Sequence, residues 1–152
     1  MVSDSTQASM ASRLHPTTQD IQLLLRSARR IAVLGIKPES HGHQPAFYVP
    51  HYLKEAGYDV IPVPVYFPQI ETILGTRVIH ALAEVPGPVD IVNIFRRPDD
   101  IPQHLPDLLS LKPRAVWMQS GISHPQVATV LAENGIIVVQ DRCIMVEHRM
   151  LP

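Results

Sequence analysis

Continuous apolar stretches alternate along this chain with stretches whose apolar residues recur every three or four positions. The first periodic stretch follows Thr17, whose hydroxyl can cap a free N–H group and so predicts the start of a helix. The apolar face of this helix comprises Ile21, Leu24, Leu25 and Ala28. The next stretch, IAVLG from residue 31, is apolar throughout, which is typical of a central parallel strand buried on both faces.

A second helix is predicted over residues 46–56. Proline in a helix interior costs about 3 kcal/mol, so Pro50 requires that this helix begin no earlier than Pro45. Gly57 then supplies the residue that most often follows a helix end.

Strands and helices continue to alternate to the end of the chain. The remaining predicted helices run from 100 to 111, with an interruption at Pro106, and from a cap at Ser123 to residues 134–135. The remaining predicted strands are residues 59–65, 77–79, 88–95, 114–121 and 136–140. This alternation predicts the α/β class: a Rossmann-like, doubly wound parallel sheet in three αβα layers, folded as a single domain.

The length of 152 residues suits one domain with its own core, predicted over residues 17–152 after a flexible tail of residues 1–16. The single cysteine excludes an internal disulfide and is typical of the reducing cytosol, so a cytoplasmic location is predicted. A net charge of -1 without a basic patch argues against a nucleic-acid partner. No membrane span is expected, because no run approaches roughly 18–20 apolar residues.

Ligands of doubly wound sheets bind at the carboxyl ends of the strands, near the point where the strand order reverses. That rule selects four loops in this chain. They are residues 35–45, 63–68, 95–99 and 119–123.

The first of these loops leads into a helix start, where unpaired N–H groups and the helix dipole attract phosphate. Gly35, Lys37 and Ser40 suit such a site, although they also fit a tight turn without a ligand. An NAD site would need a carboxylate at the carboxyl end of the second strand. The acid of that strand, Asp59, is at the opposite end, which argues against NAD.

The third and fourth loops bring further polar groups to the same edge of the sheet. Arg96 and Arg97 suit bidentate contacts with phosphate, or they offset Asp99 and Asp100. The QSG motif at residues 119–121 adds two polar side chains and a glycine, which either frame a ligand or form a turn.

Other chemistry has weaker support. No cysteine or carboxylate at ligand spacing completes a metal site with the three histidines between residues 41 and 51, so no metal is expected. Cys143 with Asp141 and His148 suggests a nucleophilic site, but a lone cysteine is more often a small buried apolar residue. No catalytic residue is therefore predicted.

Six side chains outside the loops are predicted to have structural roles. Trp117 and Met118 lie in a predicted strand and are expected in the core. Tyr48 and Tyr52, four apart on the second helix, are expected to pack against the sheet. An ion pair between Arg142 and Glu147 is expected to fix the C-terminal segment.

Six blocks of this sequence occur in order: IAVLGIKPE, YLKEAGYDVIPV, ILGTRV, PVDIVNIFRRP, VWMQSGI and VVQDRCIMVEH. Together they resemble the small stand-alone CoA-binding proteins, which are similar to the CoA-binding domain of the succinyl-CoA synthetase α subunit. The blocks span about residues 31–151. The resemblance implies a Rossmann-like domain that binds coenzyme A or an acyl-CoA across the strand ends. A non-catalytic carrier, sensor or accessory subunit is expected, because none of the histidines lies in a motif like the phosphorylated histidine of the synthetases.

The resemblance also implies where the parts of coenzyme A contact this chain. The pyrophosphate is expected at the first loop and the following helix start, the adenosine near the end of the second strand, and the pantetheine arm between the third and fourth loops. The implied residues are Gly35, Ile36, Lys37, Ser40, Pro45, Ala46, Val63, Pro64, Phe95, Arg96, Arg97, Pro98, Gln119, Ser120 and Gly121.

This chain departs from its relatives on the expected ligand face. Lys37 and Ala46 stand where serine is common, and Pro64 and Val65 stand where Asn-Pro is common. These departures keep open the alternative of a protein-interaction module with a decayed nucleotide pocket. A small NAD(P)- or CoA-ester-dependent enzyme is the other alternative. A homodimer or a protein partner is also expected of small proteins of this kind.

Overall fold

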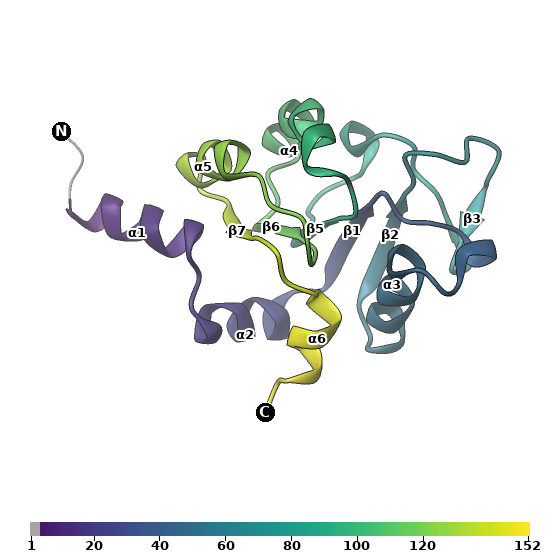
Figure 1. Ribbon diagram of the computed structural model, residues 1–152, viewed down its shortest axis with the longest axis horizontal. Helices are drawn as coiled ribbons and strands as arrows, with labels where there is room; N and C mark the ends of the chain where they lie inside the picture. Colours follow the sequence, from purple (N-terminus) through teal and green to yellow (C-terminus); the bar gives the residue numbers. More distant parts are fainter. Residues whose placement is uncertain (1–3) are drawn as a thin grey trace.

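Five parallel strands form the central sheet, in the spatial order β2-β1-β5-β6-β7 (Figure 1). The computed structural model describes residues 4–152. The strands of the sheet are β1 (Arg30–Leu34), β2 (Asp59–Val63), β5 (Ile91–Ile94), β6 (Ala115–Met118) and β7 (Ile137–Val139). A separate antiparallel pair, β3 (Thr72–Ile73) and β4 (Thr76–Arg77), follows β2 in the chain.

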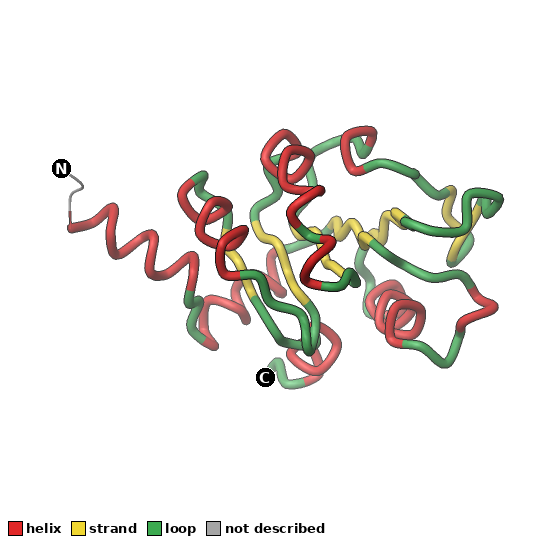
Figure 2. Tube along the Cα trace, turned by 45° about the horizontal axis from the view of Figure 1, so that its top comes forward, coloured by secondary structure: helices red, strands yellow, loops and turns green. Residues whose placement is uncertain are grey.

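Helices cover both faces of the sheet (Figures 1 and 2). The α-helices are α1 (Asp4–Leu14), α2 (Thr18–Ser27), α3 (Pro45–Glu55), α4 (Leu105–Leu111), α5 (Pro125–Glu133) and α6 (Ile144–Arg149). The short 3₁₀ helices in the described residues are η1 (Glu39–His41), η2 (Leu82–Glu84), η3 (Pro98–Asp100) and η4 (Pro102–His104). Helices α2, α3 and α6 share one apolar core, and α4 and α5 share the other. The predicted doubly wound, three-layer α/β fold is thus confirmed.

The order of the strands reverses between β1 and β5. The chain passes from β1 through α3 to β2 on one side and later returns to β5 on the other side of β1. The loops after β1 and β5 therefore leave the carboxyl edge of the sheet in opposite directions. A doubly wound sheet opens its ligand crevice at this point.

The buried strand β6 holds the C-terminal segment against the sheet. Trp117 and Met118 are fully buried, as predicted. The indole Nε1 of Trp117 donates to the carbonyl oxygen of Arg142 at 2.8 Å. Arg142 Nη1 in turn pairs with Glu147 Oε1 at 3.1 Å, which confirms the predicted ion pair.

Of the two helix caps predicted from the sequence, one is present in the structure and one is not. Thr17 Oγ1 accepts from the N–H of Asp20 at 3.1 Å, and Asp20 Oδ2 accepts from the N–H of Thr17 at 2.9 Å, so the predicted cap is a full capping box. The cap predicted at Ser123 is wrong. Helix α5 is capped by His124, whose Nδ1 accepts from the N–H of Val127 at 3.1 Å.

The predicted helix over residues 100–111 is divided into 3₁₀ turns followed by α4. The division lies ahead of Leu105 rather than at Pro106. Pro106 stands in the first turn of α4, where no backbone N–H is needed.

Residues 4–14 form helix α1, where the sequence predicted a flexible tail. Arg13 Nε donates to the carbonyl oxygen of Ala132 in α5 at 2.7 Å, and Leu14 packs against the core on the α4–α5 face. The helix was missed because its small polar residues have little apolar periodicity. Residues 1–3 of the predicted tail lie outside the described part. Across residues 4–152, no helix has the length and apolar character needed to cross a membrane.

Candidate ligand-binding pocket

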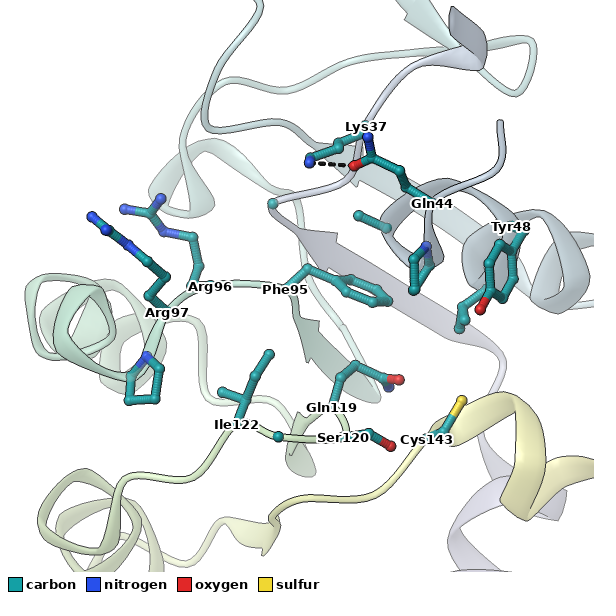
Figure 3. Close-up of a pocket in the computed structure, with 16 residues that line it drawn as sticks. Lys37, Gln44, Tyr48, Phe95, Arg96, Arg97, Gln119, Ser120, Ile122 and Cys143 are labelled. Carbon is teal, nitrogen blue, oxygen red and sulfur yellow. Dashed lines mark hydrogen bonds between the residues drawn. The ribbon is translucent and has the colours of Figure 1, made fainter. Parts of the chain in front are cut away.

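A cavity of about 540 Å³ opens at the carboxyl edge of the sheet, where the strand order reverses (Figure 3). Its walls come from the loops after β1, β5 and β6, the first turns of α3, and the residue ahead of α6. The lining residues are Gly35, Lys37, Gln44, Pro45, Ala46, Tyr48, Val49, Phe95, Arg96, Arg97, Pro98, Gln119, Ser120, Gly121, Ile122 and Cys143.

Gly35 allows the loop after β1 to cross close to the end of β5. Its φ is +87°, and a Cβ atom at this position would lie 2.1 Å from the carbonyl oxygen of Phe95. Backbone bonds close the crossing: Gly35 N–H donates to Val63 at 2.9 Å, and Phe95 N–H donates to Leu34 at 2.8 Å. Only glycine fits here, because both the conformation and the space exclude a side chain.

The loop after Gly35 is attached to α3 through a carbonyl group that a proline leaves free. Helix α3 begins at Pro45, the earliest start that the sequence allowed and one residue ahead of the predicted range, and it contains Pro50 in its interior rather than in its first turn. Pro50 has no N–H, so the carbonyl oxygen of Ala46 lacks its usual helical donor. The backbone N–H of Lys37 takes that place at 3.1 Å. The proline therefore provides the attachment point for the pocket loop.

The side chain of Lys37 lies at the start of the same helix. Its Nζ donates to Oε1 of Gln44, the residue ahead of the helix, at 2.5 Å. Gln44 makes no side-chain cap, Pro45 has no N–H, and the first turn of α3 contains no acid. The ammonium group and the positive end of the helix dipole therefore both act on this side of the cavity.

Arg96 brings a nearly buried positive charge to the cavity, with a residue exposure of 8%. Its Nε donates to Nε2 of His104 at 3.2 Å, and Nη1 donates to the hydroxyl of Tyr66 at 3.5 Å. Burial, and then the charge of Arg96, lower the pKa of His104 and favour the neutral imidazole that accepts this bond. Within residues 4–152, neither Arg96 nor Lys37 pairs with a carboxylate.

Arg97 has a different environment from its neighbour. Its side chain is 82% exposed, and its Nε pairs with Oδ2 of Asp100 at 3.1 Å. The prediction that an arginine of this pair offsets an aspartate therefore applies to Arg97, and no carboxylate in the described part of the chain pairs with Arg96.

Two buried amides lie at the other side of the cavity. Gln119 lines the pocket although it is only 4% exposed, and its Nε2 donates to Oδ1 of Asn93 at 2.5 Å. The Nδ2 atom of Asn93 is buried without a hydrogen-bond partner. Oε1 of Gln119 accepts no hydrogen bond from the described residues. Figure 3 shows Gln119, Ser120 and the half-buried Cys143 on the same side of the pocket, with the arginines on the other side of Phe95.

The cavity brings together eleven of the fifteen residues predicted to contact a ligand. These are Gly35, Lys37, Pro45, Ala46, Phe95, Arg96, Arg97, Pro98, Gln119, Ser120 and Gly121. They come from three loops and a helix start, as the position of strand ends in a parallel sheet requires.

The other four predicted residues do not line the cavity. Ile36 is buried in the core shared by α2, α3 and α6, so its side chain lies away from the opening. Val63 and Pro64, at the end of β2, are buried. Ser40 is exposed on η1, where its Oγ contacts Nδ1 of His41 at 3.0 Å. The end of β2, where the adenosine was predicted to bind, therefore does not form part of the cavity wall.

The residues of the suggested nucleophilic site are engaged separately. Nδ1 of His148 lies 2.7 Å from the hydroxyl of Tyr52, and Oδ1 of Asp141 accepts from the N–H of Gly121 at 2.6 Å. Cys143 lines the cavity without either of them. Among the described residues, no group of three or more His, Cys, Asp or Glu side chains is placed to hold a metal ion.

A family model described as "CoA binding domain" matches residues 29–149, which contain all the lining residues. The chain belongs to the CoA-binding domain family. The resemblance seen in the sequence blocks is thereby confirmed.

Relatives of this CoA-binding domain match it over nearly their whole length. The uncharacterized protein YneT of Bacillus subtilis (strain 168) is 34% identical over 136 residues, covering 88% of this chain and 96% of YneT. A solved structure from Thermus thermophilus, cell-free ID.343, is 43% identical with a TM-score of 0.82, covering 90% of this chain and 99% of that chain. A hypothetical protein from Pyrococcus horikoshii OT3 is 29% identical with a TM-score of 0.81, covering 91% and 94%.

Five lining residues of the CoA-binding domain were not predicted: Gln44, Tyr48, Val49, Ile122 and Cys143. The prediction that Tyr48 packs against the sheet is wrong, since it is 40% exposed at the pocket. Gln44 and Ile122 are next in the chain to Pro45 and Gly121, which were predicted, so their place at the pocket could have been expected from the sequence. Cys143 belongs to the block VVQDRCIMVEH, but only the fold brings that segment to the pocket.

Proposed function

We propose that this protein binds coenzyme A or an acyl-CoA in the pocket at the carboxyl edge of its sheet, as a non-catalytic carrier or sensor. The phosphates lie toward Lys37, Arg96 and the start of α3. The pantetheine arm runs past Phe95 toward the Gln119 loop. The observation that carries the proposal is the pair of pocket cations, Lys37 and Arg96, whose hydrogen-bond partners are all neutral.

The charge of the pocket supports an anionic ligand. A nearly buried guanidinium without a counter-ion is costly, and a phosphate oxygen would relieve that cost through charge-assisted hydrogen bonds. None of the lining residues carries a carboxylate that would repel such a ligand or compete for the cations. Coenzyme A carries a pyrophosphate and a further phosphate on its ribose, so it offers several such groups.

The end of β2 favours coenzyme A over NAD. A dinucleotide site uses a carboxylate at this position to hold the ribose hydroxyls. Here Val63 and Pro64 are apolar and buried, and Asp59 pairs with Arg30 at the other end of the strand. The pocket therefore has a place for phosphate without the group that selects NAD.

The remaining lining suits a narrow chain that contains amides. Phe95, Val49 and Ile122 supply apolar surface, and Gln119 supplies an amide group to the same cavity. The pantetheine arm of coenzyme A is a linear chain with two amide groups. Pockets of roughly 300–1,000 Å³ with apolar walls and a few polar groups are typical of small-molecule sites.

Thermal unfolding with CoA, acetyl-CoA, NAD and NADP at equal concentrations tests this proposal. A ligand at 100 times its dissociation constant adds about 2.7 kcal/mol to the unfolding free energy, which gives a clear rise in Tm. We expect the rise with CoA and acetyl-CoA and none with NAD or NADP. A flat response to both CoA compounds, or a larger rise with NAD, would overturn the proposal.

A further inference from the structure

The pocket has two chemically different sides. Lys37 and Arg96 provide positive charge on one side, and Cys143 lies beyond Phe95 on the other, beside the Gln119 loop (Figure 3). A ligand that fills both sides needs anionic groups at one end and a group that suits a thiol at the other.

Buried polar groups mark the thiol side as a place for a ligand. Gln119 is 4% exposed, lines the cavity, and has an Oε1 atom that no described residue satisfies. Among the described side-chain atoms, Nδ2 of Asn93 is the one that is buried without a partner, so Oε1 of Gln119 is open to the cavity and can accept from an amide N–H of a ligand. Gln119 therefore offers a hydrogen-bonding group for a ligand chain in the cavity that Cys143 also lines, independently of the sulfur itself.

The sulfur of Cys143 is free to react. Cys143 directly precedes α6 but makes no side-chain capping bond to it. It is half-buried, lines the cavity, and is the only cysteine of the 152 residues, so no second thiol of this chain competes for it.

We infer that Cys143 forms a mixed disulfide with the thiol of coenzyme A, so that the pocket holds CoA covalently and reversibly. This inference rests on the proposed function, which places the pantetheine arm along the Gln119 loop. The oxidant is a disulfide of coenzyme A. The Cys143 thiolate attacks one sulfur of that disulfide, the new S–S bond forms as the old one breaks, and one CoA leaves as a thiolate that takes up a proton. A thiol reductant reverses the exchange.

The test uses the reduced full-length chain and CoA disulfide, followed by intact mass spectrometry without reductant. We expect one adduct per chain, mapped to the peptide that contains Cys143 and removed by dithiothreitol. Glutathione disulfide is the matched reagent, because it has the same reactive bond and no nucleotide. CoA disulfide should react at least about tenfold faster, since binding holds its sulfur near the thiol. Excess acetyl-CoA, whose thiol is blocked, should slow the reaction.

Two variants separate the pocket from general reactivity. Arg96→Ala should reduce the preference for CoA disulfide over glutathione disulfide, because it removes a cation from the anionic side. Arg77→Ala removes an exposed arginine on β4, away from the pocket, and should keep the full preference. Cys143→Ser should form no adduct. If that variant fails to fold, peptide mapping of the wild-type chain still locates the adduct.

The outcomes distinguish the two proposals. If acetyl-CoA stabilises the protein but CoA disulfide reacts no faster than glutathione disulfide, the covalent inference is wrong and CoA binding stands. If neither CoA compound stabilises the protein and no preference is seen, both are wrong. A preferred adduct that survives Arg96→Ala undiminished would also contradict the geometry on which the inference rests.

Discussion

The backbone N–H of Lys37 donates to the carbonyl oxygen of Ala46, the acceptor that Pro50 leaves free within α3. A residue with no donor of its own therefore determines where the first pocket loop is attached. This arrangement offsets part of the cost of an interior proline, because the freed carbonyl keeps a partner.

Pro50→Ala should weaken CoA binding while changing stability little. Alanine supplies an N–H that competes with Lys37 for the Ala46 carbonyl, so the loop loosens and affinity falls by about threefold, or about 0.7 kcal/mol. The unfolding free energy should stay within about 1 kcal/mol, since the new helical bond offsets the greater freedom of the unfolded chain. Calorimetric titration and urea unfolding measure both. Pro106→Ala, in the first turn of α4, is the control and should leave affinity unchanged; equal affinities for all three proteins would refute the link.

Gly35→Ala should destabilise the fold strongly. The added Cβ would lie 2.1 Å from the carbonyl oxygen of Phe95, at a φ of +87°. Gly135→Ala is a matched control, because its φ is +83° and nothing lies within 4 Å of an added Cβ. The control should lose about 1–2 kcal/mol from the left-handed conformation alone, and Gly35→Ala should lose at least about 2 kcal/mol more. Similar losses in urea unfolding would show that the close approach is unimportant.

Lys37→Ala and Arg96→Ala should each weaken CoA binding by about 1–3 kcal/mol, because each variant leaves a phosphate oxygen without its hydrogen-bond partner. Arg97→Ala should cost less than about 1 kcal/mol, because Arg97 is exposed and already paired with Asp100. Titration calorimetry at constant salt gives the three affinities. If neither Lys37→Ala nor Arg96→Ala changes the affinity, neither residue contacts CoA and the proposed phosphate site is wrong.

The stability of the protein should decrease as the pH falls below about 6.5, the ordinary imidazole pKa. Burial, followed by the charge of Arg96, lowers the pKa of His104 in the folded state, with Asp107 and Asp100 opposing the shift. The unfolded chain therefore takes up its proton first, and stability is lost until the folded-state pKa is passed. Urea unfolding at pH about 7.5 and about 5 measures the loss.

His104→Gln is the variant for this effect, because glutamine keeps an acceptor for Arg96 and does not titrate. Its loss of stability between the two pH values should be smaller than that of the wild type. Burial also lowers the pKa of His148, so His148→Gln should reduce the loss separately. A wild-type loss that persists in full in His104→Gln would show that His104 does not contribute.

Arg13→Ala should loosen helix α1. It removes the 2.7 Å bond from Nε to the Ala132 carbonyl, and a loss of about 1 kcal/mol is expected. Limited proteolysis should then cut faster within residues 4–14, while the rest of the chain resists. Arg77→Ala serves as the control. Cutting at equal rates in both variants would indicate that this contact does not hold the helix.

The fold could be predicted largely from the sequence, because the burial of a strand or of one helix face shows directly in the spacing of its apolar residues. The apolar strand at residues 31–35 and the periodic helix after Thr17 each report their own surroundings. Gly35, Arg96 and Gln119 were found for the same reason: each follows a strand, and parallel strands end at one edge.

The missed features depend on contacts between distant parts of the chain. Arg13 and Ala132 are 119 positions apart, and no local pattern connects them. Cys143 reaches the pocket because Trp117 holds the carbonyl of Arg142, which is a tertiary contact. Tyr48 lies at the pocket rather than on the sheet because of how α3 is rotated, and a sequence period alone does not set that rotation.

The position of Cys143 also determines when the pocket can exist during synthesis. Gly35 and Lys37 leave the ribosome early, and Arg96 and Gln119 follow much later, but the last wall is absent until the segment after Trp117 has folded back onto β6. A nascent chain shorter than about residue 143 therefore has no complete pocket. A ligand that needs this last wall can therefore bind in full only to chains that have already assembled every strand of the sheet.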